Sequence, residues 1–185
     1  MGNDYLRSVI KQFEYYQSLG ERTFDQLPEE KVLWQYNEAS NSIAIVVNHL
    51  CGNMKSRWTN FLTSDGEKPW RERDTEFEQI IKTKDELLVR WNVGWDCLFG
   101  ALESVDADNF NTEVYIRNQS HSITEAVNRH LAHYSYHIGQ IVYIGRMIKG
   151  KDWKSLSIPK GESSFFNESK FSKGKHGGHF TDGLV

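Results

Sequence analysis

Residues 122–149 read SITEAVNRHLAHYSYHIGQIVYIGRMIK, and this stretch predicts a long helix. Ser122 and Glu125 are three residues apart, which is the spacing of a pair that caps the free N–H groups at a helix start. At about 100° of rotation per residue, three histidines and three isoleucines fall within a sector about 80° wide. These residues are His130, His133, His137, Ile141, Ile144 and Ile148. The face expected to be buried therefore carries imidazole rings.

His133 and His137 are one helical turn apart, so both rings can bind a single metal ion. A lone HxxxH pair more often consists of two packed histidines that donate to backbone carbonyls. Three neutral rings in an aliphatic stripe lack obvious partners, however, and each unpaired polar group costs roughly 1–3 kcal/mol when buried. A shared cation offsets that cost, so the pattern favours a metal site. Because Tyr134 stands where metalloproteases of the HExxH type have Glu, peptidase chemistry is disfavoured.

The composition limits the class of protein. A chain of 185 residues is long enough for one domain with a sizeable core. Its formal charge of −3, with both signs interspersed, lacks the basic stripe expected of a nucleic-acid-binding protein. No apolar run approaches the 18 or so residues of a membrane span. Two cysteines and no recognisable secretory leader predict a cytoplasmic protein.

Three further segments show helical periodicity. They run from Tyr5 to about Leu19, from the capping residues Ser40–Ser42 to about Leu62, and from Asp74, the expected cap, to about Ser104. Residues 114–116 are expected to be extended, but too short for a sheet. The glycine- and lysine-rich composition predicts a disordered, flexible tail over residues 172–185. Residues 1–171 therefore predict one all-α domain, a four-helix bundle with irregular connections.

A third candidate ligand lies in the second predicted helix. His49 is followed by Asn53 and Arg57 at one-turn intervals, which makes a polar seam beside an apolar face. In helical bundles, metal sites form from side chains on facing helices. If the second and fourth helices face each other, His49 completes a three-histidine set with His133 and His137. The alternative for Arg57 is a helix edge in contact with water.

Several motifs also suggest a family. They are Ser40-Asn-Ser-Ile, His49-Leu-Cys-Gly-Asn-Met, Ser56-Arg-Trp, Phe61-Leu, Asp65-Gly-Glu-Lys-Pro-Trp-Arg, Arg73-Asp and His133-Tyr-Ser-Tyr-His137-Ile-Gly-Gln140-Ile. Over roughly residues 4–170 the chain resembles the DUF1572 branch of the DinB/YfiT-like superfamily of four-helix metalloproteins. The resemblance implies an up-down-down-up bundle, often dimeric, with zinc or nickel bound by His49, His133 and His137. His130 has no counterpart in that pattern, and with Asn53 and Arg57 it is expected to line a pocket or support the ligands.

The resemblance also suggests a function. Characterised relatives include S-transferases that use bacillithiol or mycothiol, and others are suspected hydrolases. Three neutral nitrogens leave an open coordination position, as in catalytic zinc sites. A thiol or water bound there would lose its proton near neutral pH. The leading hypothesis is transfer of a small-molecule thiol to a small electrophile held in a tryptophan-rich cavity, by a homodimer without nucleic-acid or membrane partners.

Two alternatives remain open. One is a metal-dependent hydrolase, although the motif at residues 133–141 contains no carboxylate to act as general base. The other is a non-enzymatic, metal-binding stress-response module in which the ion only joins two helices.

Overall fold

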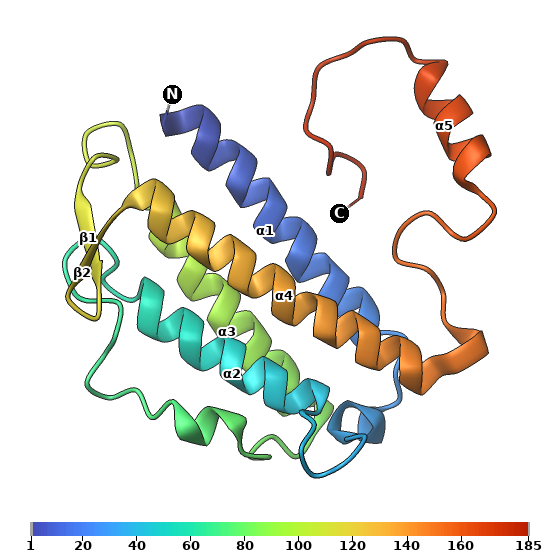
Figure 1. Ribbon diagram of the computed structural model, residues 1–185, viewed down its shortest axis with the longest axis horizontal. Helices are drawn as coiled ribbons and strands as arrows, with labels where there is room; N and C mark the ends of the chain where they lie inside the picture. Colours follow the sequence, from blue (N-terminus) through green and yellow to red (C-terminus); the bar gives the residue numbers. More distant parts are fainter. Residues whose placement is uncertain (1, 185) are drawn as a thin grey trace.

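Four long helices and a short β-hairpin organise the computed structural model, which describes residues 2–184, with side chains from residue 4 (Figure 1). The helices are α1 (Gly2–Phe24), α2 (Ile43–Trp58), α3 (Lys84–Glu103), α4 (Ile123–Lys149) and the short α5 (Ser163–Phe171). Single 3-10 turns cover Glu29–Leu33 (η1), Asp74–Phe77 (η2) and Gly150–Asp152 (η3). The hairpin pairs β1 (Glu113–Ile116) with β2 (Gln119–Ser122). The described chain is thus mostly helical, as predicted.

Contacts between helix ends give the directions of the four long helices. Tyr5, near the start of α1, donates a hydrogen bond to the carbonyl of Thr124 at the start of α4, so these helices are parallel. Lys84 begins α3 and donates to the carbonyl of Phe24 at the end of α1. Helix α3 is therefore antiparallel to α1. Helix α2 lies beside α3 and parallel to it, because Arg90 contacts Asn48 and Cys97 contacts Met54 further along both helices (Figure 1). The order is up-down-down-up, which confirms the expected bundle.

Helix α2 is buried along almost its whole length. It packs against α3 on one side and α4 on another, and the segment containing η2 covers a third side (Figure 1). Large aromatic side chains fill the space between these helices, led by Trp58, Trp91, Trp95, Tyr134 and Phe13. A helix buried on all sides needs an apolar surface all round, and α2 has one except at a few polar positions.

The helix starts follow the capping chemistry of the sequence at two places. Ser42 accepts a hydrogen bond from the backbone N–H of Ile45 and so caps α2. Ser122 and Glu125 form the expected reciprocal capping box at the start of α4. These caps fix where the two helices that carry the histidines begin.

The predicted start of the third helix is wrong. Thr83, not Asp74, caps α3, and Asp74 instead begins the single turn η2. Between the end of η2 and Thr83 the chain is non-helical and inserts Ile81 into the core, where its side chain is buried. Lys84, the first residue of α3, donates to the carbonyls of Phe24 and Leu27 and so joins the start of α3 to the end of α1. The second helix also ends earlier than expected, at Trp58.

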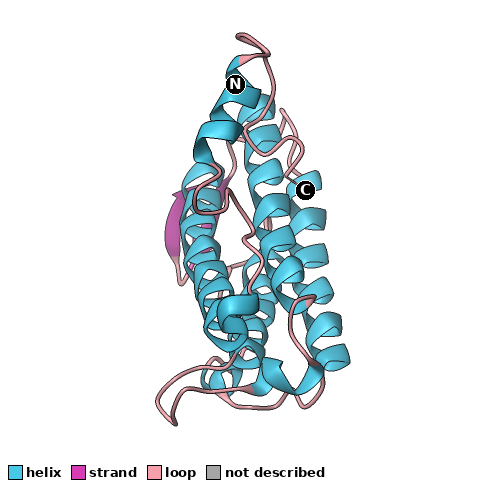
Figure 2. Cartoon of the chain, turned by 90° about the vertical axis from the view of Figure 1, so that its right-hand side faces the viewer, coloured by secondary structure: helices cyan, strands magenta, loops and turns pink. Residues whose placement is uncertain are grey.

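The expectation that residues 114–116 are too short for a sheet is also wrong, because they pair with residues 119–121. Arg117 and Asn118 form the two-residue turn with positive φ angles of 55° and 60°, as this hairpin type requires. Both of their backbone N–H groups donate to the carboxylate of Asp65, at 2.8 and 2.7 Å. The hairpin is thereby tied to the loop that follows α2, on the outside of the bundle (Figure 2).

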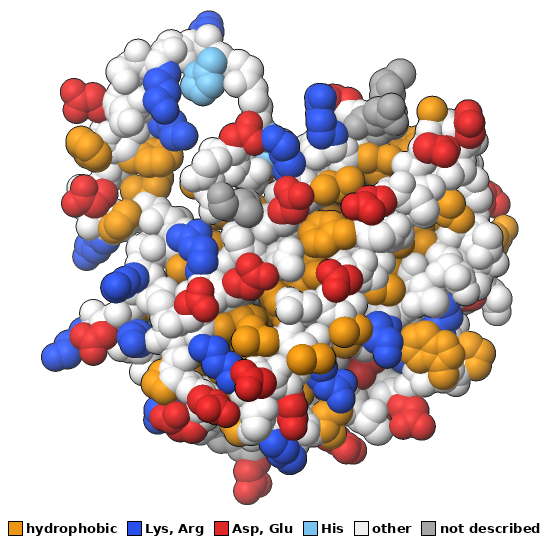
Figure 3. Space-filling view, turned by 180° about the vertical axis from the view of Figure 1, so that it is seen from behind, with side chains coloured by type: hydrophobic (Ala, Val, Ile, Leu, Met, Phe, Trp, Pro, Cys, Tyr) orange, Lys and Arg blue, Asp and Glu red, His pale blue; other side chains and the backbone are white. Residues whose placement is uncertain are grey.

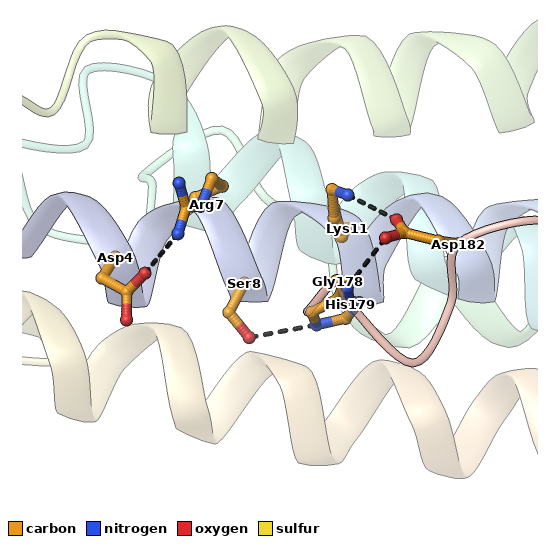
Figure 4. Close-up of a pocket in the computed structure, with 7 residues that line it drawn as sticks. All are labelled: Asp4, Arg7, Ser8, Lys11, Gly178, His179 and Asp182. Atoms are coloured by element: carbon orange, nitrogen blue, oxygen red, sulfur yellow. Dashed lines mark hydrogen bonds and ion pairs between the residues drawn. The ribbon is translucent and has the colours of Figure 1, made fainter. Parts of the chain in front are cut away.

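Disorder from residue 172 onward stays a prediction, although the described part of this segment, up to residue 184, returns to α1. His179 lies 3.1 Å from the hydroxyl of Ser8, and Asp182 pairs with Lys11 at 2.5 Å (Figure 4). A pocket between α1 and this segment is lined by these residues and by Asp4, and it includes none of His49, His133 and His137. Here His179 contacts α1 rather than another histidine.

Charged side chains of both signs are interspersed over the face shown in Figure 3. Within residues 2–184, no helix combines the length and apolar character needed to cross a bilayer.

Candidate metal centre

Three imidazole rings converge between α2 and α4. The Nε2 atoms of His133 and His137 are 3.0 Å apart, and that of His133 is 3.4 Å from Nε2 of His49. One nitrogen from each ring lies within 4.8 Å of the other two. His49 and His137 are 3% and 8% exposed. The structure thus brings together all three residues that the sequence singled out as ligands.

The two helices are joined beside the cluster by a chain of buried hydrogen bonds. Trp58 on α2 donates from Nε1 to the hydroxyl of Tyr134 on α4 at 2.9 Å. That hydroxyl in turn donates to Oδ1 of Asn53 on α2 at 3.0 Å. Because α2 and α4 are antiparallel and fixed in register here, His49 faces the turn of α4 that carries His133 and His137.

Glu76 orients the His49 ring. Nδ1 of His49 donates to the carboxylate at 2.9 Å, and Arg71 donates to the same carboxylate at 2.7 and 2.9 Å. Burial alone would raise the pKa of Glu76, but the hydrogen bonds from His49 and Arg71 outweigh it and lower the pKa. The ring of Phe77 stacks on the ring of His49, with the two ring centroids 4.6 Å apart. Glu76 was not among the residues predicted from the sequence, and its place shortly after the Asp65-to-Arg71 motif was the available signal.

Gln140 orients the His137 ring in the same way, since Nδ1 lies 2.8 Å from its amide oxygen and donates to it. With Nδ1 protonated on both His49 and His137, their Nε2 atoms carry lone pairs that point at Nε2 of His133. His133 has at most one hydrogen to offer there, so at least one lone pair lacks a donor. A cation would satisfy all three nitrogens, and carboxylate and amide partners behind histidines are typical of metal centres.

Two of the three rings, those of His133 and His137, are held in the unprotonated form that binds metal. Burial, followed by the nearby rings of His137 and His49, lowers the pKa of His133 to about 3. Burial also lowers the pKa of His137, although its hydrogen bond with Gln140 opposes the shift. Ligation requires unprotonated imidazole, so protons compete weakly for these nitrogens near neutral pH. The donor set, its burial and its supporting hydrogen bonds therefore fit a divalent ion such as zinc.

The other expected residues lie beside the cluster in different settings. Arg57 is buried, not at a water-exposed helix edge; it donates to the carbonyl of Gly66 and to Glu67 at 3.1 Å. Asn53 is engaged with Tyr134. His130 is buried against Trp58, its Nδ1 has no hydrogen-bond partner, and burial lowers its pKa well below the usual value. All three line a cavity but make no hydrogen bond to the ligand histidines.

That cavity has a volume of about 430 Å³ and opens beside the three histidines. Its other lining residues are Phe77, Tyr136 and the arginines at 57, 71, 73, 117 and 129. The expectation of a tryptophan-rich cavity is wrong, because no tryptophan lines it among the described residues. Trp58, Trp91 and Trp95 fill the core instead.

A family model described as a protein of unknown function, DUF1572, matches residues 1–162. No curated protein and no solved structure matches the chain.

We expect the His133→Ala variant to lose metal. Removing the central nitrogen leaves two donors, so the affinity for Zn²⁺ or Ni²⁺ should fall at least about 100-fold. Elemental analysis of purified protein and titration against a chromogenic chelator measure this. His176→Ala, which changes an exposed residue of the C-terminal segment, is the control and should retain the ion. Equal metal content in the two variants would contradict three-histidine ligation.

We expect Gly52→Ala to weaken metal binding without changing a ligand. A Cβ atom at position 52 would clash with Oε1 of Glu76, so the carboxylate that pairs with His49 must shift. Loss of such a supporting partner typically costs about 10–100-fold in affinity. Gly139→Ala is the matched control, because its Cβ would meet nothing within 4 Å although it lies two residues after His137. Unchanged zinc affinity in Gly52→Ala would show that Glu76 does not orient the site.

We expect the metal-free protein to lose stability as the pH falls below about 6.5. The pKa of His133 is about 3 in the folded chain, so between these values only the unfolded chain takes up its proton. The free energy of unfolding should drop by about 1 kcal/mol at pH 5.5 for each histidine that stays neutral. Urea unfolding at pH 7.5 and 5.5 measures the drop, and His130→Phe should reduce it. A midpoint independent of pH would contradict the buried neutral state.

Proposed function

We propose that this chain, which belongs to the DUF1572 family, binds zinc or nickel through His49, His133 and His137 and transfers a small-molecule thiol to a small electrophile. The proposal depends on one observation, the convergence of three imidazole nitrogens beside an open cavity of about 430 Å³. A structural metal site would instead be closed by a fourth protein ligand. Among the described residues, the cluster offers three ligands and no fourth.

A divalent ion bound here would lower the pKa of a thiol that it holds, and so would supply a thiolate nucleophile at neutral pH. The residues of the chain do the rest. Glu76 and Gln140 hold the rings of His49 and His137 with their Nε2 lone pairs facing inward. Tyr136, exposed at the rim, and Phe77 provide flat surfaces against which an acceptor can pack.

Hydrolysis is the less favoured reaction at the same site. It would use a general base to take a proton from water, and carboxylates commonly do this. No Asp or Glu lines the cavity among the described residues, and the nearby Glu76 already accepts hydrogen bonds from His49 and Arg71. Thiol transfer has less need of such a base, because a thiol is far more acidic than water.

Placement of the family within the DinB/YfiT-like superfamily is part of this proposal. It is supported by the up-down-down-up order of the long helices and by one histidine on α2 with two on α4.

We expect zinc-loaded or nickel-loaded protein to accelerate the reaction of bacillithiol with a chloro-aromatic acceptor, and metal-free protein and His133→Ala to lose that acceleration. The thiolate forms the new carbon–sulfur bond as the carbon–chlorine bond breaks and chloride leaves. Absorbance of the thioether product measures the rate. Absence of any metal-dependent rate with bacillithiol, mycothiol, cysteine or glutathione would remove thiol transfer, and turnover of esters in thiol-free buffer would favour hydrolysis.

A further inference from the structure

The wall of the cavity beside the three histidines is unusually rich in arginine. Five guanidinium groups line it, and they come from separate segments of the chain: Arg57 from α2, Arg71 and Arg73 from the segment before η2, Arg117 from the hairpin turn and Arg129 from α4. The lining residues that the structure describes include neither Asp nor Glu. Such a wall attracts negative charge.

Nearby carboxylates neutralise only part of this charge. Glu67 accepts from Arg57, Arg71 and Arg117 at 3.1, 3.4 and 3.1 Å. Glu76 pairs with Arg71 at 2.7 Å. The five guanidinium groups therefore share these two carboxylates and one more distant group, Asp74. A bound divalent ion would add to the excess of positive charge.

The two arginines least engaged with carboxylates lie next to the histidines. Arg73 is 3.9 Å from the exposed Asp74 and packs on the ring of Phe77 at 5.2 Å. Phe77 in turn stacks on His49, so Arg73 stands one ring away from the cluster. Arg129 is one helical turn before His133 on α4, and its Nη1 lies 3.2 Å from Nε2 of His121. Neither guanidinium group is held by a buried carboxylate.

Two of the remaining arginines, Arg57 and Arg71, are buried and fixed in place before any ligand arrives. The side chain of Arg71 is 2% exposed, and the side chain of Arg57, which donates to the carbonyl of Gly66, is 6% exposed. A guanidinium group presents paired N–H donors that match the two oxygens of a carboxylate or phosphate. With Arg57 and Arg71 fixed and Arg73 and Arg129 free of buried carboxylates, the cavity is suited to bind an oxyanion without reorganising the site.

We propose that this cavity selects an anionic small molecule, whose carboxylate or phosphate oxygens are bound by Arg73 and Arg129 while its reacting end faces the three histidines. The cavity volume of about 430 Å³ suits a small metabolite rather than a polymer. The inference rests on the proposed function in that it names the class of ligand for the same site. Either the thiol or its acceptor carries the negative charge.

The test measures binding, not turnover, on the full chain with and without zinc. Calorimetric titrations use succinate and inorganic phosphate as anionic probes and succinamide as the neutral control. We expect at least one anion to bind at least about tenfold more tightly than succinamide, with affinity falling as NaCl is raised. The double variant Arg73→Gln/Arg129→Gln should weaken the binding of that anion about tenfold. Arg146→Gln, in the last turn of the same α4, should leave it unchanged.

The outcomes separate the two proposals. Anion binding that requires Arg73 and Arg129 supports the selectivity even if no thiol transfer is found, in which case the proposed function fails alone. Equal binding of succinate, phosphate and succinamide overturns the selectivity even if thiol transfer is found. Binding that is equally weakened by Arg146→Gln also overturns it, because a general surface charge would then explain the effect. Circular dichroism of each variant verifies that the fold is retained.

Discussion

The burial of α2 on all sides is the constraint on which the rest of the structure depends. A buried polar group without a partner costs about 1–3 kcal/mol, so each buried polar side chain of this helix needs one. Asn48 donates to the carbonyl of Glu76 at 2.9 Å, and Ser56 donates to the carbonyl of Gly66 at 2.7 Å. The segment from Gly66 to Glu76 therefore has to wrap over α2, and in doing so it brings a carboxylate against His49.

The same wrapping segment links the stability of the fold to the electrostatics of the cavity. Glu67 accepts hydrogen bonds from arginines in different parts of the chain, Arg57 and Arg117. Glu76 accepts hydrogen bonds from both His49 and Arg71. Removing one partner of a buried ion pair typically costs about 3–5 kcal/mol, because the other charge is left uncompensated. The Arg71–Glu76 pair is of this kind, so the support of His49 and the packing of the segment cannot be separated.

The sequence predicted the elements whose signals are local. Helical periodicity identified the four long helices, and the capping residues Ser42 and Ser122 marked the starts of α2 and α4. The one-turn spacing of His133 and His137, together with His49, predicted the histidine cluster. The start of α3 was misplaced because Asp74 is a good cap in isolation, whereas the burial of Ile81 decides that stretch.

Features made by distant segments were harder to predict. Glu76 and the arginines at 71, 73, 117 and 129 come together only through the wrapped segment, the hairpin and α4. The local sequence around each of these residues does not distinguish it from a surface residue. For the same reason, the sequence left open whether Arg57 lines a pocket or lies at a helix edge in contact with water. The hairpin was missed because Gln119–Ser122 lacks the apolar alternation typical of a strand, and its pairing depends on the turn bound by Asp65.

The hydrogen-bond chain from Trp58 through Tyr134 to Asn53 has one more consequence. It fixes the spacing of the two helices independently of any ion, unlike a zinc finger, which metal must fold. Metal binding then does not have to order the polypeptide, so the free energy of coordination contributes to metal affinity. A frame of constant width would also favour cations whose preferred bond length matches the spacing of the three imidazole nitrogens.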